Sequence, residues 1–74
     1  MSLYNAKINT PFQIVSIPDV ELLKNLGVNI SREVTIQNRY AFGGPVLLRV
    51  QGTYSVALGK DIASQILVKE VAIR

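Results

Sequence analysis

Large apolar side chains recur at every second position in three consecutive stretches between residues 33 and 58. This spacing predicts three β-strands, because successive side chains of a strand point to opposite faces of its sheet. One face of each strand would be buried, and the other, which includes Arg39, would meet solvent. The residues predicted to face inward are Val34, Ile36, Asn38, Tyr40, Val46, Leu48, Val50, Tyr54, Val56 and Leu58.

The link between the second and third of these strands can be tested against the same pattern. Directly opposed residues of an antiparallel pair point to the same face of the sheet. A three-residue loop at positions 51–53 places Val50 opposite Tyr54, whereas a two-residue turn would place it opposite Ser55. Because burial favours the apolar pair, we expect a three-residue hairpin loop that contains Gly52.

Two glycines and a proline separate the first and second of these strands. Gly43 and Gly44 can adopt backbone angles that other residues avoid, and Pro45 then fixes its own φ near about −65°. The sequence therefore predicts a tight corner. Phe42 stands at its tip, where the ring either folds inward as a plug or projects as a contact for another molecule.

One short helix is predicted at about residues 19–26. Asp19 is its predicted N-cap, and Gly27 is its predicted C′ residue in the left-handed conformation. An isolated helix of this length is marginal in water, so its apolar stripe must pack on the rest of the chain. The stripe consists of Val20, Leu23 and Leu26, with Leu22 beside it.

Two more strands and one helical turn complete the predicted elements. Residues 11–17 are β-branched and aromatic, and Asn9 ahead of them can turn the chain through a positive φ. Residues 61–65 predict a single helical turn, and residues 67–74 predict a last strand with Val68 facing inward. Five short strands around one small core favour a compact barrel.

The residue types that are missing narrow the function. The 74 residues include no histidine and no cysteine, so the chain lacks the usual general base, the thiol nucleophile and the commonest ligands of transition metals. We therefore expect neither an enzyme nor a bound cofactor. Carboxylate and carbonyl oxygens leave open only a weak site for Fe²⁺ or another divalent metal.

Charge and hydropathy indicate a single small cytoplasmic domain. The net charge of +3 comes from eight basic and five acidic residues spread along the whole chain, whereas a nucleic-acid surface usually concentrates its basic residues. No segment approaches the about 20 apolar residues of a membrane span. The first residues also lack the hydrophobic core of a signal peptide.

The order of these landmarks resembles the FeoA family, the small ferrous iron transport protein A, whose domain recurs at the C-terminus of some iron-dependent repressors. The resemblance covers nearly the whole chain and is carried by "ELLKNLGV", "EVTI", "RYAFGGPVLLRVQG", "YSVAL" and "DIASQILV". It implies a mainly β fold, a five-stranded SH3-like barrel. It also implies a non-enzymatic role in ferrous iron uptake, in which the chain binds and regulates the cytoplasmic region of the membrane GTPase permease FeoB.

The resemblance supplies no firm set of binding residues, so we predict the interface on physical grounds. The apolar candidates are Phe42 at the corner, Leu47 on the outward face of its strand, and Leu22 as the helix leucine least needed for the core. Arg39 and Arg49 flank the corner in sequence and suit an acidic partner. Membrane contact would come only through the permease, and self-association stays open.

Two other functions stay open as alternatives. The basic balance and the barrel class suit a small nucleic-acid-binding protein, although aromatic residues are sparse. A metal-responsive domain like the C-terminal domain of iron-dependent repressors is the other alternative. Such a domain would act only together with a partner that reads DNA.

Overall fold

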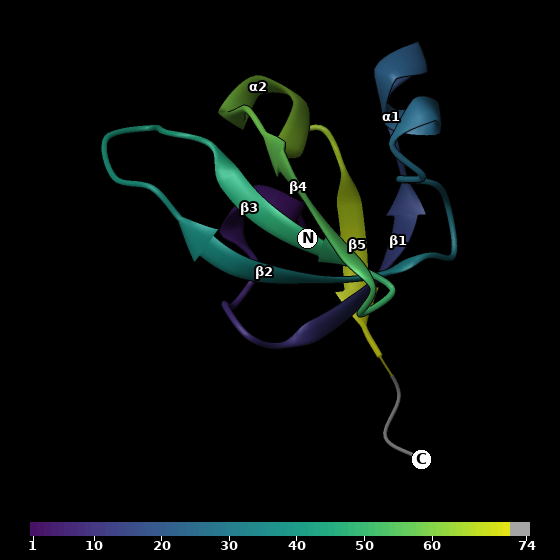
Figure 1. Cartoon of the computed structure of the whole chain (residues 1–74), viewed down its shortest axis with the longest axis horizontal. Coiled ribbons are helices and arrows are strands. Elements are labelled where there is room, and N and C mark those ends of the chain that lie inside the picture. Colours follow the sequence, from purple (N-terminus) through teal and green to yellow (C-terminus); the bar gives the residue numbers. More distant parts are fainter. Residues whose placement is uncertain (72–74) are drawn as a thin grey trace.

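The computed structural model describes residues 1–71 of the chain. All five strands belong to one antiparallel sheet, in the order β4-β3-β2-β1-β5. The predicted mainly β fold is confirmed, while residues 72–74 of the predicted last strand lie outside the described residues. The elements in chain order are η1 (Leu3–Asn5), β1 (Pro11–Ser16), α1 (Glu21–Asn25), β2 (Glu33–Arg39), β3 (Val46–Val50), β4 (Tyr54–Leu58), α2 (Lys60–Ala63) and β5 (Leu67–Glu70) (Figure 1).

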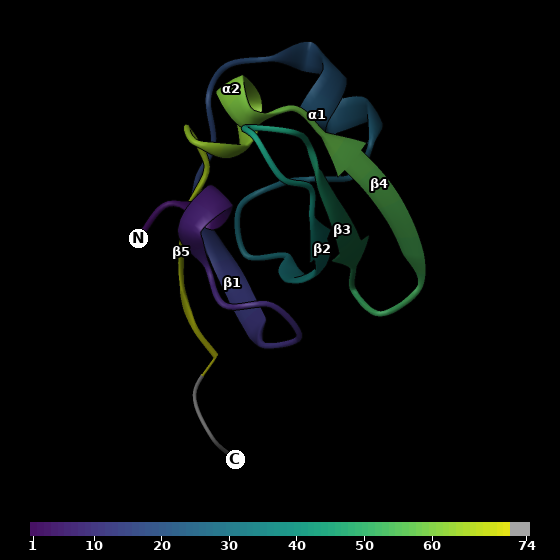
Figure 2. The ribbon, with the colours of Figure 1, turned by 90° about the vertical axis from the view of Figure 1, so that its left-hand side faces the viewer.

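The sheet curls around one apolar core. Figure 2 shows β1 and β5 on one side of the molecule and β3 and β4 on the other. The inward residues of β3 and the first two of β2 are fully buried, as the alternation predicted, and no polar side chain is buried among residues 1–71. The core consists of Leu3, Ala6, Phe12, Ile14, Leu23, Val28, Val34, Ile36, Val46, Leu48, Val50, Leu58, Ala63, Ile66 and Val68.

The predicted alternation of β2 breaks one residue after Ile36. The pairing with β3 shifts there by one position, so that an extra residue bulges out of β2. A shift of one residue exchanges the two faces of a strand. Asn38 and Tyr40 are therefore exposed, and Arg39 is half-buried. The prediction that Asn38 and Tyr40 face inward is wrong.

The hairpin between β3 and β4 has the predicted register. Its loop spans residues 51–53, and Thr53 N–H donates to the carbonyl of Val50 at 3.0 Å. Gln51 and Gly52 have φ angles of 53° and 70°. The prediction of inward-facing residues in β4 holds only in part, because Tyr54 at its start is exposed. The opposed pairs are Val50 with Tyr54, Leu48 with Val56, and Val46 with Leu58.

Helix α1 begins two residues later than predicted. Val20 occupies the N-cap position without a side-chain hydrogen bond, and its N–H donates to the carbonyl of Pro18 at 2.9 Å. This local turn leaves Asp19 outside the helix, with its carboxylate fully exposed and 4.0 Å from Lys24 Nζ. The prediction of Asp19 as the N-cap is therefore wrong.

The end of α1 has the geometry of a Schellman motif. Gly27 has a φ of 76°, and its N–H donates to the carbonyl of Lys24 at 3.1 Å. The N–H of Val28 reaches back to the carbonyl of Leu23 at 2.8 Å. Leu23 is fully buried, whereas Leu22 is 55% exposed, so one central leucine anchors the helix while its neighbour faces solvent.

The remaining boundaries follow the sequence closely. β1 begins at Pro11, and Asn9 ahead of it has a φ of 60°. α2 begins at Lys60, one residue before the predicted helical turn, and Gly59 is its N-cap without a side-chain hydrogen bond. Val68 in β5 is buried, as predicted.

Candidate interaction surface

The corner between β2 and β3 is the end of a β-hairpin, drawn as the teal loop at the left of Figure 1. Phe42 and Gly43 occupy its tip, with φ angles of 60° and 73°. Two consecutive positive φ angles are the mark of a type I′ turn, whose twist matches the flanking strands. Two main-chain hydrogen bonds close it, from Tyr40 N–H to Pro45 C=O at 3.1 Å and from Gly44 N–H to Ala41 C=O at 3.2 Å.

Glycine is required twice in this corner, for different reasons. Gly43 adopts the left-handed conformation that other residues take at a cost in free energy. A Cβ atom on Gly44 would lie 3.0 Å from the Cβ of Tyr40 and 3.2 Å from the carbonyl oxygen of Ala41. These contacts leave little room for a side chain, so the local sequence keeps the corner tight.

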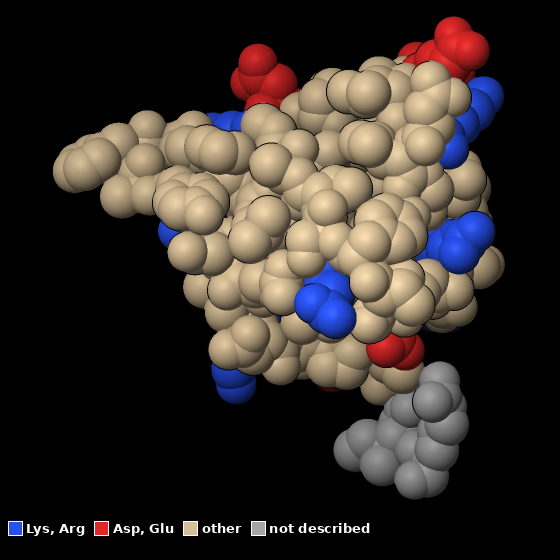
Figure 3. Space-filling view, viewed as in Figure 1, with Lys and Arg blue, Asp and Glu red and all other residues tan. Residues whose placement is uncertain are grey.

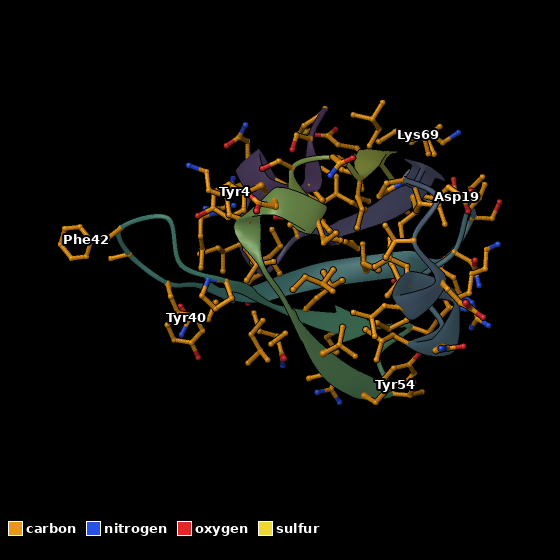
Figure 4. The ribbon with its side chains drawn as sticks, turned by 90° about the horizontal axis from the view of Figure 1, so that it is seen from above. Tyr4, Asp19, Tyr40, Phe42, Tyr54 and Lys69 are labelled. Atoms are coloured by element: carbon orange, nitrogen blue, oxygen red, sulfur yellow. The ribbon has the colours of Figure 1, made fainter. Side chains whose placement is uncertain are left out.

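The ring of Phe42 projects from the tip of the corner into solvent. Its relative exposure is 106%, and Figure 4 shows it beyond the rest of the molecule. Of the two alternatives that the sequence left open, the inward plug is wrong. A bulky residue with positive φ carries a backbone strain of about 1–3 kcal/mol, and no contact of the ring within the described chain offsets it.

Side chains from three elements brace the base of the corner. The hydroxyl of Tyr4 in η1 donates to the carbonyl of Gly44 at 3.1 Å. Its ring lies between two cations, with Arg39 Cζ 5.9 Å and Lys60 Nζ 5.6 Å from the ring centroid. These contacts connect the base of the corner to η1 and α2.

The guanidinium of Arg39 also supports the base of the corner. Its Nε donates to the carbonyl of Tyr4 at 2.7 Å, and its Nη2 donates to the carbonyl of Ala6. The bulge in β2 turns the guanidinium toward these main-chain acceptors. The sequence offered Arg39 as a contact for an acidic partner; in the structure it is half-buried, and two of its guanidinium nitrogens bond main-chain carbonyls.

The other predicted contact residues lie at different distances from the corner. Leu47 is half-buried on the outer face of β3, next to the first rung of the hairpin. Arg49 is exposed three residues beyond Val46, so it does not flank the corner in space as it does in sequence. Leu22 lies on α1, at the opposite side of the molecule from the corner in Figure 1.

Tyr40 is exposed, although the alternation of β2 predicted that it faces the core. It is 47% exposed at the base of the corner, and Figure 4 shows it pointing away from the core. Asn38, two residues earlier on the same face, pairs with Leu47. The exposed Tyr40 and Phe42 and the half-buried Leu47 lie on the same hairpin, and we call these three residues the corner surface.

The corner surface carries no charge of its own. Residues 40–48 include no Asp, Glu, Lys or Arg, and Figure 3 shows the projecting loop without red or blue atoms at its tip. On the face seen there, the basic side chains stand apart from one another. The chemistry of the corner surface suits an apolar pocket on a partner.

The described side chains do not assemble a metal centre. Among residues 1–71, no three His, Cys, Asp or Glu side chains lie close enough together to hold a metal ion. None of the helices formed by these residues is long and apolar enough to cross a membrane.

The chain matches the family model of the FeoA domain over residues 1–70. A comparison with curated proteins gives no match. Among solved structures, iron(II) transport protein A from Clostridium thermocellum superposes with a TM-score of 0.85 at 25% identity, covering 96% of this chain and 46% of that one. A FeoA-like protein from Clostridium acetobutylicum superposes with a TM-score of 0.80 at 26% identity, covering 100% of this chain and 90% of that one.

The same fold also occurs in a larger protein. A manganese-dependent transcriptional repressor superposes with a TM-score of 0.86 at 17% identity, covering 96% of this chain. The chain spans only 41% of that repressor and 46% of the transport protein A chain. Together with the sheet order, these neighbours assign the fold to the SH3-like barrels, as predicted.

Proposed function

This chain belongs to the FeoA domain family, and we propose that it is a non-catalytic accessory protein of ferrous iron uptake that binds and regulates the GTPase region of a FeoB-type permease. The family is tied to ferrous iron transport. A solved relative at 25% identity is described as an iron(II) transport protein. The proposed partner contact is the corner surface.

The observation that carries this proposal is the position of Phe42. Its ring is fully exposed at the tip of a type I′-like turn, on a backbone with positive φ. In the free protein this arrangement costs free energy and buries nothing. Burial of the ring in a pocket of a partner would contribute about 2–3 kcal/mol to binding, and aromatic anchors of this kind dominate many interfaces.

Rigidity of the corner favours binding further. The hydrogen bonds of Tyr4 and Arg39 hold the base of the hairpin in one arrangement. A preorganised loop loses little conformational entropy when it docks. Tyr40 and Leu47 nearer the base of the hairpin are also uncharged, so the partner would meet an uncharged surface.

Regulation follows from the same contact. A ring that fits a pocket present in only one conformation of the GTPase region shifts the population toward that conformation. The chain would then change the rate of GTP hydrolysis without contributing any reacting group. A variant without the ring should lose both the binding and the change in rate.

Calorimetric titration of the purified GTPase region from the same organism tests the proposal. We expect wild-type binding, and a loss of about tenfold or more in affinity for Phe42→Ser. Ile30→Ser is the matched control, because Ile30 is 59% exposed but follows α1, away from the corner. Absence of wild-type binding, or equal affinities of Phe42→Ser and Ile30→Ser, would contradict the proposal.

The two alternative functions have less support in the described residues. A metal-responsive role has no cluster of donor side chains behind it in residues 1–71. A nucleic-acid-binding role would use concentrated basic side chains, whereas those on the face of Figure 3 stand apart.

A further inference from the structure

The rest of the chain covers the outer edge of one border strand of the sheet, β5, but not that of the other, β4. The outer edge of β5 is covered by the first residues, since Val68 N–H donates to Met1 C=O and Leu3 N–H donates to Ile66 C=O, both at 2.8 Å. The outer edge of β4 has no such cover, because β4 ends the strand order and pairs only with β3. In Figure 2, β4 forms the outer right-hand border of the sheet.

The hydrogen-bond pattern identifies the free main-chain groups of β4. Gln51 N–H donates to Glu33 C=O toward β2. Because the main-chain groups of successive residues point to opposite sides of a strand, those of Val50 point toward β4. The β4 residues opposed to Val50, Leu48 and Val46 therefore use their main-chain N–H and C=O groups to bond to β3. The N–H and C=O groups of Ser55 and Ala57 point away from β3, and within residues 1–71 no hydrogen bond outside the β3–β4 pairing reaches them.

The open edge of β4 lacks the features that usually prevent strand pairing. Charged side chains, prolines and bulges commonly protect such edges. The segment Tyr54–Leu58 has no charge and no proline, and its register with β3 runs without a bulge. Ser55 and Ala57 are exposed and small, so no side chain blocks the approach of another strand.

We propose that two copies of this chain associate through antiparallel pairing of β4 with β4, around a two-fold axis at Val56. In this register Ser55 of one copy lies opposite Ala57 of the other. Each such pair exchanges both of its free N–H···O=C hydrogen bonds, and the symmetry repeats the pair on the other side of Val56. The two sheets become one continuous sheet.

The edge is complementary to itself in this register, and its uncharged side chains admit a second copy as the occupant. The chain carries a net charge of +3, so self-association needs a seam in which no two cations oppose each other. A row of neighbouring side chains crosses the joined sheets, from Arg49 and Ser55 of one copy to Ala57 and Leu47 of the other. Each Arg49 therefore faces only uncharged side chains of the second copy.

The pairing leaves Phe42, the anchor of the proposed permease contact, outside the seam, while Leu47 of the corner surface pairs with Ala57 beside it. A contact of a single strand pair is small, and small interfaces are transient. We therefore expect association that grows with protein concentration, with monomer predominating in dilute solution.

Cross-linking through single cysteines tests the register, since the natural chain contains no cysteine. Residues at the two-fold axis in a non-hydrogen-bonded pair have Cβ atoms about 4.5–5.5 Å apart, near the range that a disulfide bridges. Under mild oxidation, Val56→Cys should form covalent dimer about tenfold faster than Ser55→Cys. Faster dimer formation by Ser55→Cys, although Ser55 is the more exposed site, would overturn the register.

Sedimentation measurements test the association itself. The average mass of the wild type should rise above 8.1 kDa with concentration. Ala57→Pro should stay monomeric, because it removes a free N–H that β3 does not use. Ala57→Lys keeps the N–H and adds one cation per copy to the seam, in the row that holds Ser55 and Arg49 of the other copy, so it should weaken association even if the proline variant fails to fold. A wild type that stays at the monomer mass at millimolar concentration, or an Ala57→Lys variant that associates equally, would overturn the proposal. An edge of β4 that pairs only with an added permease region, and not with a second copy, would also overturn it.

Discussion

The hydroxyl of Tyr54 donates a hydrogen bond to the main-chain carbonyl of Leu26 at 2.6 Å. The hydroxyl lies in the space that a Cβ atom on Gly27 would occupy. Glycine is therefore required at the end of α1 both by its φ of 76° and by a side chain from β4. This contact ties the helix to the edge of the sheet.

Gly27→Ala should destabilise the protein by about 2 kcal/mol, through positive φ and the clash with the Tyr54 hydroxyl. In a Tyr54→Phe background the clash is removed, and we expect the cost of Gly27→Ala to fall by about half. Urea unfolding of the four proteins measures the coupling. Equal costs of Gly27→Ala in both backgrounds would show that the hydroxyl does not impose the glycine.

Two adjacent leucines of α1 should differ strongly in their contribution to stability. Leu23 is fully buried, so Leu23→Ala should lower the free energy of unfolding by about 3 kcal/mol. Leu22 faces solvent, and Leu22→Ala should change it by less than about 0.5 kcal/mol. Thermal and urea denaturation give both values, and similar costs for the two variants would contradict the burial of α1.

Arg39 and Arg49 should respond differently to the same conservative change. Arg39 bonds two main-chain carbonyls with its guanidinium, and a lysine ammonium cannot reproduce that fork. Arg39→Lys should cost about 1–2 kcal/mol of stability, while Arg49→Lys on the exposed face should be neutral within about 0.5 kcal/mol. A stable Arg39→Lys variant would mean that the brace of the corner does not depend on this geometry.

The sequence predicted those features that a local pattern determines. The register of the β3–β4 hairpin followed from alternation alone, because only one loop length opposes Val50 with Tyr54. The bulge in β2 leaves no comparable signal. Asn38 and Tyr40 continue the apparent alternation, and the shift that exposes them depends on their pairing with β3.

The candidate site was predicted only in part, for a similar reason. The corner was evident from its glycines and proline. Whether Phe42 packs or projects depends on the space around the hairpin, which no local pattern encodes. Arg39 looked like a free surface charge because its acceptors, the carbonyls of Tyr4 and Ala6, lie far from it in sequence. Asp19 suited an N-cap, but the local turn at Pro18 starts the helix later.

Phe42→Asn should stabilise the free protein. Asn tolerates positive φ, and Asn-Gly is the favoured tip of a type I′ turn. The exposed ring contributes no packing, so we expect the free energy of unfolding to rise by about 1 kcal/mol. Urea unfolding checks the sign, and a destabilised Phe42→Asn variant would mean that the ring contributes to the fold.

The affinity of Phe42→Asn for the GTPase region of the permease, measured on the same preparation as its stability, tests the central claim most directly. We predict opposite changes: the variant unfolds at higher urea concentration than the wild type, yet binds the GTPase region about tenfold more weakly or worse. A variant that is more stable and binds as tightly as the wild type would contradict a recognition role for the corner surface.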